Sequence, residues 1–545
     1  MSTEHTPFAR LSAALKARGF TYQGQESNGW WKFTGAVEAA GATREVFFSV
    51  DPRGRSLPRF RAQLPPDAPK VLPHIGAQGS VCYALKGSLV LDIFDVAGQA
   101  LACFDRAVGI LDLSLRGQLR QDLEDEFFVY WQGETCLLDI DRAGRADLTV
   151  MFTAHFGEES GIAVVTNDVE RTRAKLRAMN LEAEPATAAV AFKVQSKAKP
   201  RPLVDNWPPG TVSALLRWQG LLDPRAKQVL ERRLLSAAGR GQRFAACVIA
   251  TPLTHYAFWV KFADPPASGP RTGARERLYA SKVHPFTDFR IDDAYIAQRN
   301  TPGRPTLAGK KIVLVGCGTI GGFLAELLVK NGAGMSGGQL LLVDPDTLGP
   351  QNVGRHRLGF NRVLQNKAQA LRDELSASAP SSNIQAAPAH IEDVDVGGAD
   401  LLVDATGEEG VGHALTAADR RGRRFVPTLT VWVEGPGVAV RALLRAEQRE
   451  GCTRCMVGPQ GERLYPATHE PVPVELAGHG CESLFVPFPA TASVQAACLA
   501  AEMVSDWVAG VAAPHLRTVL LRRNFTLATA DCDIAKAAHC PACDT

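Results

Sequence analysis

The sequence predicts an α/β protein made of three segments, 1–132, 133–295 and 296–545. A length of 545 residues corresponds to three or four domains at about 150 residues each. The last segment alternates short apolar runs with longer helical patterns, which is typical of a doubly wound parallel sheet. Domain boundaries are expected near 131–134 and in the proline- and glycine-rich stretches 197–210 and 300–309.

The first segment is expected to be α+β. A helical pattern covers 8–18, and strand-like runs follow at 30–34 and 45–50. A proline-rich stretch then carries Cys82 in a loop, and the end of the segment is helical. The middle segment is expected to be mixed α/β, and it contains no motif that indicates chemistry.

The last segment shows the clearest pattern. Strands are expected at 310–315, 339–343 and 400–403, with helices at 319–330 and 365–376. Because apolar runs of this length alternate with helices, the strands should be parallel and covered on both faces.

Composition excludes several classes of protein. The formal net charge of +3 gives no electrostatic reason to bind nucleic acid or an anionic membrane. The longest apolar run, 490–513, contains Glu502 and Asp506, so no membrane span is expected. The first residues lack the apolar core of a secretion signal, which predicts a cytoplasmic protein whose 12 cysteines are metal ligands or thiols.

A glycine-rich turn follows the first strand of the last segment. Gly316, Gly318 and Gly321 stand where the turn opens a helix, and they would let a phosphate approach backbone N–H groups at the helix N-terminus. Asp344 ends the next strand, where a carboxylate can accept ribose hydroxyls. Alone, such a turn is weak support for a nucleotide site.

Three further side chains favour a triphosphate over a plain dinucleotide. Asn352, Arg355 and Lys367 follow on the next loop and helix, and Arg and Lys neutralise phosphate oxygens. The alternative is a solvated basic surface around 355–357.

The last segment resembles a known family. The runs GCGTIGG, LLLVDPDTLGPQNVGRHRLG, QNKAQAL and LLVDATG resemble the ThiF/MoeB-type adenylation domain of ubiquitin-activating enzymes and their sulfur-carrier relatives. The resemblance covers about 296–545 and implies a Rossmann-like fold that binds ATP. It assigns ATP contacts to Gly316, Gly318, Gly321, Asp344, Asn352, Arg355 and Lys367.

The resemblance also bears on two other positions, Arg299 and Gly407. Arg299 resembles an arginine that the family supplies across a homodimer interface, although a surface arginine is an equal alternative. The family's Mg²⁺-binding aspartate is replaced here by Gly407, so Asp404 or Glu408 would have to hold the ion.

Four cysteines form two CxxC pairs with the spacing of a structural zinc site. Each pair can occupy two corners of a tetrahedral Zn²⁺, and disulfides are the alternative. Many relatives in the resembled family carry such a site. The predicted ligands are Cys452, Cys455, Cys540 and Cys543.

Two further cysteines are candidate nucleophiles. Cys481 lies in a glycine-rich loop, and in the resembled family a loop cysteine attacks the acyl-adenylate. Cys498, in the helix that follows, is expected in the core. The run Leu72-Pro-His74-Ile, with Cys82 eight residues after His74, resembles the active-site motif of ubiquitin-conjugating enzymes. It departs at Leu72, where the family has His, and at His74, where it has Asn. His74 could donate the hydrogen bond of that Asn or be a structural loop contact.

Together the segments resemble bacterial fusions of a conjugating-enzyme-like domain with an activating-enzyme-like domain, as in CBASS and related antiphage operons. This resemblance implies that ATP activates the C-terminus of a ubiquitin-like or other protein, and that Cys481 and then Cys82 carry it to a target lysine. The implied cofactors are Mg²⁺ and Zn²⁺. The alternatives are a sulfur-carrier adenylyltransferase, a dinucleotide-dependent oxidoreductase, which Arg355, Lys367 and the four cysteines disfavour, and a nucleotide-binding scaffold.

Overall fold

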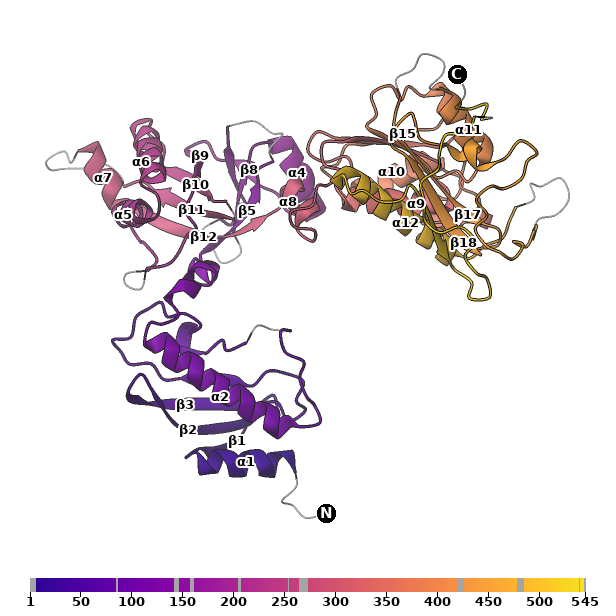
Figure 1. Ribbon diagram of the computed structural model, residues 1–545. Coiled ribbons are helices and arrows are strands. Elements are labelled where there is room, and N and C mark those ends of the chain that lie inside the picture. The colour runs from indigo at the N-terminus through magenta and orange to yellow at the C-terminus, as the bar shows by residue number, and fades with distance from the viewer. Residues whose placement is uncertain are drawn as a thin grey trace. The chain divides into compact units, whose positions relative to one another are not determined.

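The structure is a computed structural model of the chain (Figure 1). It describes residues 6–84, 87–141, 147–156, 161–203, 207–252, 254–263, 273–418, 425–477, 485–538 and 540–543. The chain divides into two compact units. The first comprises 1–136, 155–163 and 185–289, and the second comprises 137–154, 164–184 and 290–545.

The first unit begins with a four-stranded antiparallel sheet. Helix α1 (Pro7–Ala17) and the long helix α2 (Val96–Leu115) lie along it (Figure 1). Phenylalanines from the sheet and from α2 interlock in the core, where Phe104 contacts Phe20, Phe48 and Phe60 edge to face. The strands follow chain order: β1 (Thr21–Gln25), β2 (Trp31–Ala39), β3 (Ala42–Val50) and β4 (Arg59–Ala62).

The first unit also contains a mixed sheet covered by helices. An aromatic cluster packs under it, and Trp131, which is 1 % exposed, donates from its indole to the Ala257 carbonyl at 2.9 Å. The chain near 131 is therefore part of a core and not an exposed linker. The strand order is β12 (Lys282–Arg290), β11 (His255–Lys261), β10 (Phe244–Ala250) and β9 (Ala189–Gln195), with helices α3 (Phe127–Tyr130), α5 (Val212–Leu222), α6 (Pro224–Gly239) and α7 (Ala274–Ala280).

The second unit contains most of four further strands and a buried ionic contact. Lys175 lies 2.8 Å from an oxygen of Asp139 and 2.7 Å from an oxygen of Asp293. Arg171 lies 3.2 Å from the other oxygen of Asp139, so two cations balance the two buried carboxylates. The strands are β8 (Glu184–Pro185), β6 (Thr149–Phe152), β7 (Ile162–Thr166) and β5 (Glu134–Asp139), with helices α4 (Val169–Ala178) and α8 (Asp293–Gln298).

A seven-stranded sheet forms the rest of the second unit. Its first five strands are parallel, and β18 and β19 extend it antiparallel. The order is β15 (Ile384–Ala387), β14 (Gln339–Val343), β13 (Lys311–Val315), β16 (Leu401–Asp404), β17 (Thr428–Glu434), β18 (Ala439–Arg445) and β19 (Leu516–Leu520).

Helices cover both faces of this sheet. One apolar core contains residues of α9 (Thr319–Lys330), α10 (Lys367–Ser378) and α12 (Ala490–Ala509). A second core on the opposite face includes α11 (Glu409–Ala418). This is the doubly wound α/β arrangement that the sequence predicts, and the fold class is confirmed.

Local sequence explains where the helices begin and end. The Asn366 side chain accepts from the Gln369 amide at 3.1 Å and starts α10. Asp223 caps α6 in the same way and is followed by Pro224, which suits the first helical position. Gly510, with φ +66°, ends α12 in a left-handed conformation.

The chain after β19 pairs with that strand. The Leu516 amide donates to the Cys532 carbonyl at 2.8 Å, and the Cys532 amide donates back at 3.1 Å. The Thr518 amide donates to the Asp531 carboxylate at 2.9 Å. Residues 531–533 are therefore bonded to the outer side of β19.

One expectation about the core is wrong. Cys498 is exposed because α12 buries Ala496, Ala497 and Leu499 and turns position 498 away from the sheet. Within the described ranges, no helix is both long and apolar enough to cross a membrane.

Candidate active sites and metal site

The glycine loop joins β13 to α9, and it leaves no room for side chains at two positions. Gly316 has φ +85°, and a Cβ there would lie 2.8 Å from the Thr406 nitrogen. A Cβ on Gly321 would lie 1.8 Å from the Gly316 carbonyl oxygen. Gly318 differs, because nothing lies within 4 Å of its Cβ position. The loop is thus closed toward the sheet and open at Gly318, beside the N-terminus of α9, which attracts anions.

Asp344 holds this loop from the neighbouring strand. Its Oδ2 accepts from the Cys317 amide at 2.7 Å, and its Oδ1 accepts from the Asp346 amide at 2.8 Å. Burial raises the pKa of Asp344, while these amides and the Lys367 charge oppose the rise. Each carboxylate oxygen keeps a second lone pair, so the carboxylate can still accept hydroxyl donors.

Parallel register brings three predicted residues to one edge. Val315 lies opposite Val343 on one side and opposite Asp404 on the other. Gly316, Asp344 and Asp404 therefore stand together at the carboxyl ends of their strands, where ligands bind in open α/β sheets.

The predicted phosphate contacts lie on the loop after β14 and at the start of α10, and each has a protein partner. The Asn352 Oδ1 accepts from the Gly349 amide at 3.0 Å. Lys367 lies 2.8 Å from an oxygen of Asp346, which is largely exposed. Arg355 lies against two phenylalanine rings, with its guanidinium carbon 5.1 Å from the centre of Phe485 and 4.6 Å from that of Phe488.

The sequence did not single out His356 as part of this site. Its Nε2 donates to the Cys317 carbonyl at 2.8 Å, and its Nδ1 accepts from the Leu358 amide at 3.0 Å. Burial lowers the pKa of His356 to about 4. A neutral imidazole therefore supports the backbone of the glycine loop. In the sequence His356 stands between Arg355 and Arg357. It therefore resembles part of a solvated basic surface, and its burial is not evident from the sequence.

Asp404 is the best-placed candidate for a magnesium ligand. Its Oδ1 accepts from the Thr406 amide and hydroxyl at 3.1 and 2.7 Å, while its Oδ2 has no hydrogen-bond partner among the described residues. Burial raises the pKa of Asp404 to about 6. Mg²⁺ takes one or two carboxylates and completes its shell with phosphate oxygens and water, so this donor fits the ion. Gly407 has φ +74°, which disfavours the aspartate that the resembled family carries there.

Arg299 lies at the C-terminal end of α8. It is exposed, and its amide donates to the Tyr295 carbonyl at 2.8 Å where α8 ends.

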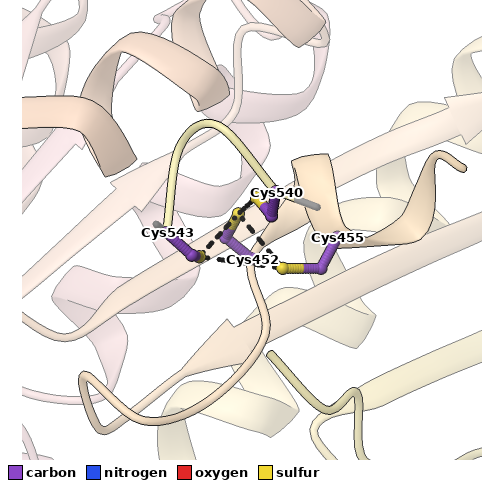
Figure 2. A group of neighbouring side chains, drawn as sticks. All are labelled: Cys452, Cys455, Cys540 and Cys543. Atoms are coloured by element: carbon purple, nitrogen blue, oxygen red, sulfur yellow. Dashed lines mark hydrogen bonds between the residues drawn. The ribbon is translucent and has the colours of Figure 1, made fainter. Parts of the chain in front are cut away.

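The four predicted zinc ligands meet in one buried cluster (Figure 2). Cys452 directly precedes the short helix Thr453–Met456, and Cys455 lies in it. Cys540 and Cys543 belong to the described residues 540–543. The Sγ atom of Cys452 lies 3.8, 3.7 and 3.3 Å from those of Cys455, Cys540 and Cys543. Bonds of about 2.3 Å to a central Zn²⁺ place sulfurs about 3.8 Å apart, whereas a disulfide needs about 2.05 Å. The Ala537 amide also points at the Cys455 sulfur, at 3.4 Å. The geometry fits a tetrahedral metal site and not two disulfides.

A thiol loop lies in the first unit. Cys82 is exposed, and its amide donates to the His74 carbonyl at 2.7 Å. His74 has φ +60°, and its amide donates to Glu126 at 2.8 Å. Its ring nitrogens face two carboxylates: Nδ1 lies 2.8 Å from Glu126, and Nε2 lies 3.0 Å from Asp122. Because both nitrogens are engaged, the geometry favours the structural role of His74 over that of a free hydrogen-bond donor.

Two hydroxyls hold the backbone before Cys82. The Tyr130 hydroxyl donates to the Leu72 carbonyl at 2.6 Å, and the Ser114 hydroxyl donates to the Pro73 carbonyl at 2.6 Å. Burial raises the pKa of Tyr130 to about 12, so the hydroxyl remains a donor at neutral pH. The loop is thus fixed by side chains from α2, α3 and Arg120–Glu124, and the thiol stays exposed.

Cys481 lies outside the described residues. On either side of the segment 478–484, Ala477 and Phe485 exchange two N–H···O bonds of 3.0 Å.

Two family models match the two parts of the chain. Residues 294–542 match the ThiF family, and residues 9–137 match prokaryotic E2 family B. Among solved structures, the E. coli MccB–ATP complex is 16 % identical and has a TM-score of 0.33, covering 50 % of this chain and 71 % of that one.

Curated relatives extend over more of the chain. A protein of Pseudomonas aeruginosa named ATP-dependent ubiquitin transferase-like protein Cap2 is 43 % identical over 98 % of this chain and 99 % of its own length. A Vibrio cholerae protein of the same name is 25 % identical over 80 % of each chain. The chain therefore belongs to the family of Cap2 ATP-dependent ubiquitin transferase-like proteins, in which a prokaryotic E2-like domain is fused to a ThiF-type adenylation domain.

Proposed function

We propose that the chain uses ATP to activate the C-terminus of a ubiquitin-like or other protein and then ligates it to an amine of a target. The observation that carries the proposal is the glycine loop, open at Gly318 and held by Asp344 at the N-terminus of α9. The name of the P. aeruginosa relative, an ATP-dependent ubiquitin transferase-like protein, supports it.

The first step is adenylation. A carboxylate oxygen of the protein substrate attacks the α-phosphorus of ATP, the bond between the α- and β-phosphates breaks, and pyrophosphate leaves. Amides of the glycine loop and Asn352 donate hydrogen bonds to the phosphates, and Arg355 and Lys367 neutralise their charge. Asp344 accepts the ribose hydroxyls, and Mg²⁺ held by Asp404 would reduce the repulsion between phosphate oxygens.

The next steps pass the acyl group between thiols. The Cys481 thiolate attacks the acyl carbon of the adenylate and AMP leaves, and the Cys82 thiolate then displaces Cys481 by thioester exchange. A lysine amine of the target attacks the second thioester, loses a proton and releases Cys82 as thiolate. Tethering both thiols on one chain raises their effective concentration to the mM range if the linker spans the sites.

Two further assignments complete the proposal. The four-cysteine cluster holds a structural Zn²⁺ that stabilises the adenylation domain. Arg299 reaches the nucleotide of a second subunit in a homodimer.

The proposal is tested with the full-length chain, ATP, Mg²⁺ and proteins encoded by neighbouring genes. We expect ATP-dependent exchange of pyrophosphate and adducts on non-reducing gels that a thiol reductant removes. Cys481→Ala should abolish the adducts but keep pyrophosphate exchange. Cys82→Ala should keep a thioester on Cys481 and lose the ligated product, while Cys498→Ser, which changes another exposed thiol, should match the unaltered chain.

Two results would contradict parts of the proposal. Unchanged product in Cys82→Ala would indicate a sulfur-carrier-type adenylyltransferase in which the first domain only docks a partner. Failure of pyrophosphate exchange with every candidate protein would exclude the adenylation step itself.

A further inference from the structure

Arg355 makes three contacts with one short segment of the chain. Its guanidinium lies over the rings of Phe485 and Phe488, at 5.1 and 4.6 Å, and its NH1 donates to the Val486 carbonyl at 3.4 Å. This segment follows Cys481 by four residues and leads directly into α12 at Ala490. Arg355 is therefore a predicted phosphate contact, and it also packs on the segment that follows the predicted nucleophile.

The partners of Arg355 differ from those of its neighbours. Arg357 pairs with Glu326 at 2.7 Å, and Arg362 pairs with Glu374 at 3.1 Å. No carboxylate pairs with Arg355 in the part of the chain that the structure describes. Burial lowers the pKa of Arg355, yet a guanidinium remains protonated at neutral pH. A half-buried cation that is balanced by ring faces and one carbonyl can still attract an anion.

The segment from Phe485 to Pro489 is also held at both of its ends. Phe485 pairs with Ala477 through two backbone bonds. At the other end, the Ala492 amide donates to the Pro489 carbonyl at 2.9 Å, where α12 begins. Between these two attachments, Arg355 supplies a contact that carries a charge.

We propose that Arg355 is a positioning residue for the thioester step: through Phe485, Val486 and Phe488 it fixes the segment that follows Cys481 while the same guanidinium contacts the phosphates. Occupancy of the phosphate site and the placement of this segment are thereby coupled. The proposal rests on the proposed function, and it adds a role that phosphate binding by Arg355 does not require.

The test compares Phe488→Ala with the unaltered full-length chain in two assays. We expect pyrophosphate exchange to stay within twofold, because Arg355 keeps its charge and its contacts with Phe485 and Val486. Formation of the reductant-sensitive adduct in a single turnover should slow at least tenfold. Phe488→Tyr keeps the ring face and should restore the rate. Phe360→Ala serves as the matched control, because this phenylalanine is 75 % exposed and no cation among the described residues lies over its ring.

A double-mutant cycle separates coupling from independent effects. Arg355→Lys keeps the charge but loses the planar group, and the double variant with Phe488→Ala should form the adduct no more slowly than Arg355→Lys alone. Effects that multiply, or a loss of exchange equal to the loss of adduct in Phe488→Ala, would overturn the proposal. Thermal unfolding of each variant controls for misfolding.

A further measurement needs no protein substrate. ATP with Mg²⁺ should slow hydrogen–deuterium exchange at 485–488 in the unaltered chain and leave it unchanged in Arg355→Lys at saturating ATP. Protection of equal size in both proteins would show that Arg355 does not link the two regions. Absence of pyrophosphate exchange in the unaltered chain would instead count against the proposed function.

Discussion

At the scale of single residues, His74 combines an unusual backbone conformation with two carboxylate partners. Its φ of +60° is a conformation that costs most L-residues about 1–2 kcal/mol. Glu126 stabilises this conformation through two contacts, one with the His74 backbone amide and one with Nδ1. Asp122 contacts Nε2. The bonded carbonyl of His74 then fixes the Cys82 amide. The histidine thus connects the thiol loop to two acidic side chains of the following helical turns.

We predict that His74→Ala destabilises the loop by about 2 kcal/mol, since it loses both carboxylate contacts and keeps the left-handed strain. His74→Asn should cost about half as much, because asparagine tolerates positive φ. The measurement is the rate of Cys82 alkylation by iodoacetamide, resolved by peptide mass spectrometry, which should rise in His74→Ala. An unchanged alkylation rate combined with complete loss of transfer would indicate instead that the ring donates to the reacting oxyanion.

At the scale of elements, two glycines of the glycine loop differ in role: Gly321 is structural, and Gly318 is functional. Gly321 is required by the fold, because any Cβ would collide with the Gly316 carbonyl. Gly318 has open space at its Cβ position and φ −75°, which other residues also adopt. Substitution of Gly321 should therefore lower stability, whereas substitution of Gly318 should weaken ATP binding.

We predict that Gly318→Ala changes the stability of the adenylation domain by less than about 1 kcal/mol, while it weakens ATP binding at least tenfold by placing a methyl group where phosphate approaches. Gly321→Ala should destabilise the domain by about 1–3 kcal/mol or more, as overpacking does. Calorimetric titration with ATP and Mg²⁺, beside thermal unfolding, distinguishes the two. Unaltered ATP affinity in Gly318→Ala would mean that the phosphates do not lie at this loop.

The elements of the parallel sheet were predictable because they depend on local patterns. Helix 319–330 and strand 339–343 have the expected bounds, and helix α10 begins two residues later than expected, where Asn366 caps it. The antiparallel extension by β18 and β19 was not predicted, since pairing of 439–445 with 516–520 joins segments distant in sequence. The contact of Arg355 with Phe485 and Phe488 was missed for the same reason.

At the scale of the whole molecule, motif spacing predicted the fold class and the family, and it predicted the four-cysteine cluster. The individual ATP contacts, Arg299 and the roles of Cys82 and Cys481 stay predictions. Lys367 shows why sequence does not decide such roles: its Nζ lies 2.8 Å from Asp346, a partner that a basic pattern alone does not reveal.

We predict one zinc ion per chain, measured by elemental analysis of the purified protein. Removing the ion with a chelator, or changing Cys540→Ser, should destabilise the second unit by at least about 3 kcal/mol. This loss is smaller than the apparent binding free energy of zinc in zinc-finger peptides, which is about 10–16 kcal/mol. Cys532→Ser, a nearby thiol outside the cluster, should keep both the metal and the unfolding temperature. Full stability after complete metal removal would contradict a structural metal.

The pairing of residues 531–533 with β19 gives metal loss a second consequence. That segment lies between β19 and the cluster ligands Cys540 and Cys543, so a chain that has released its metal can also release the segment. The freed N–H and C=O groups of β19 would then form an uncovered sheet edge, which is a template for pairing with another chain. Chelation should therefore produce concentration-dependent aggregates in light scattering before the domain unfolds.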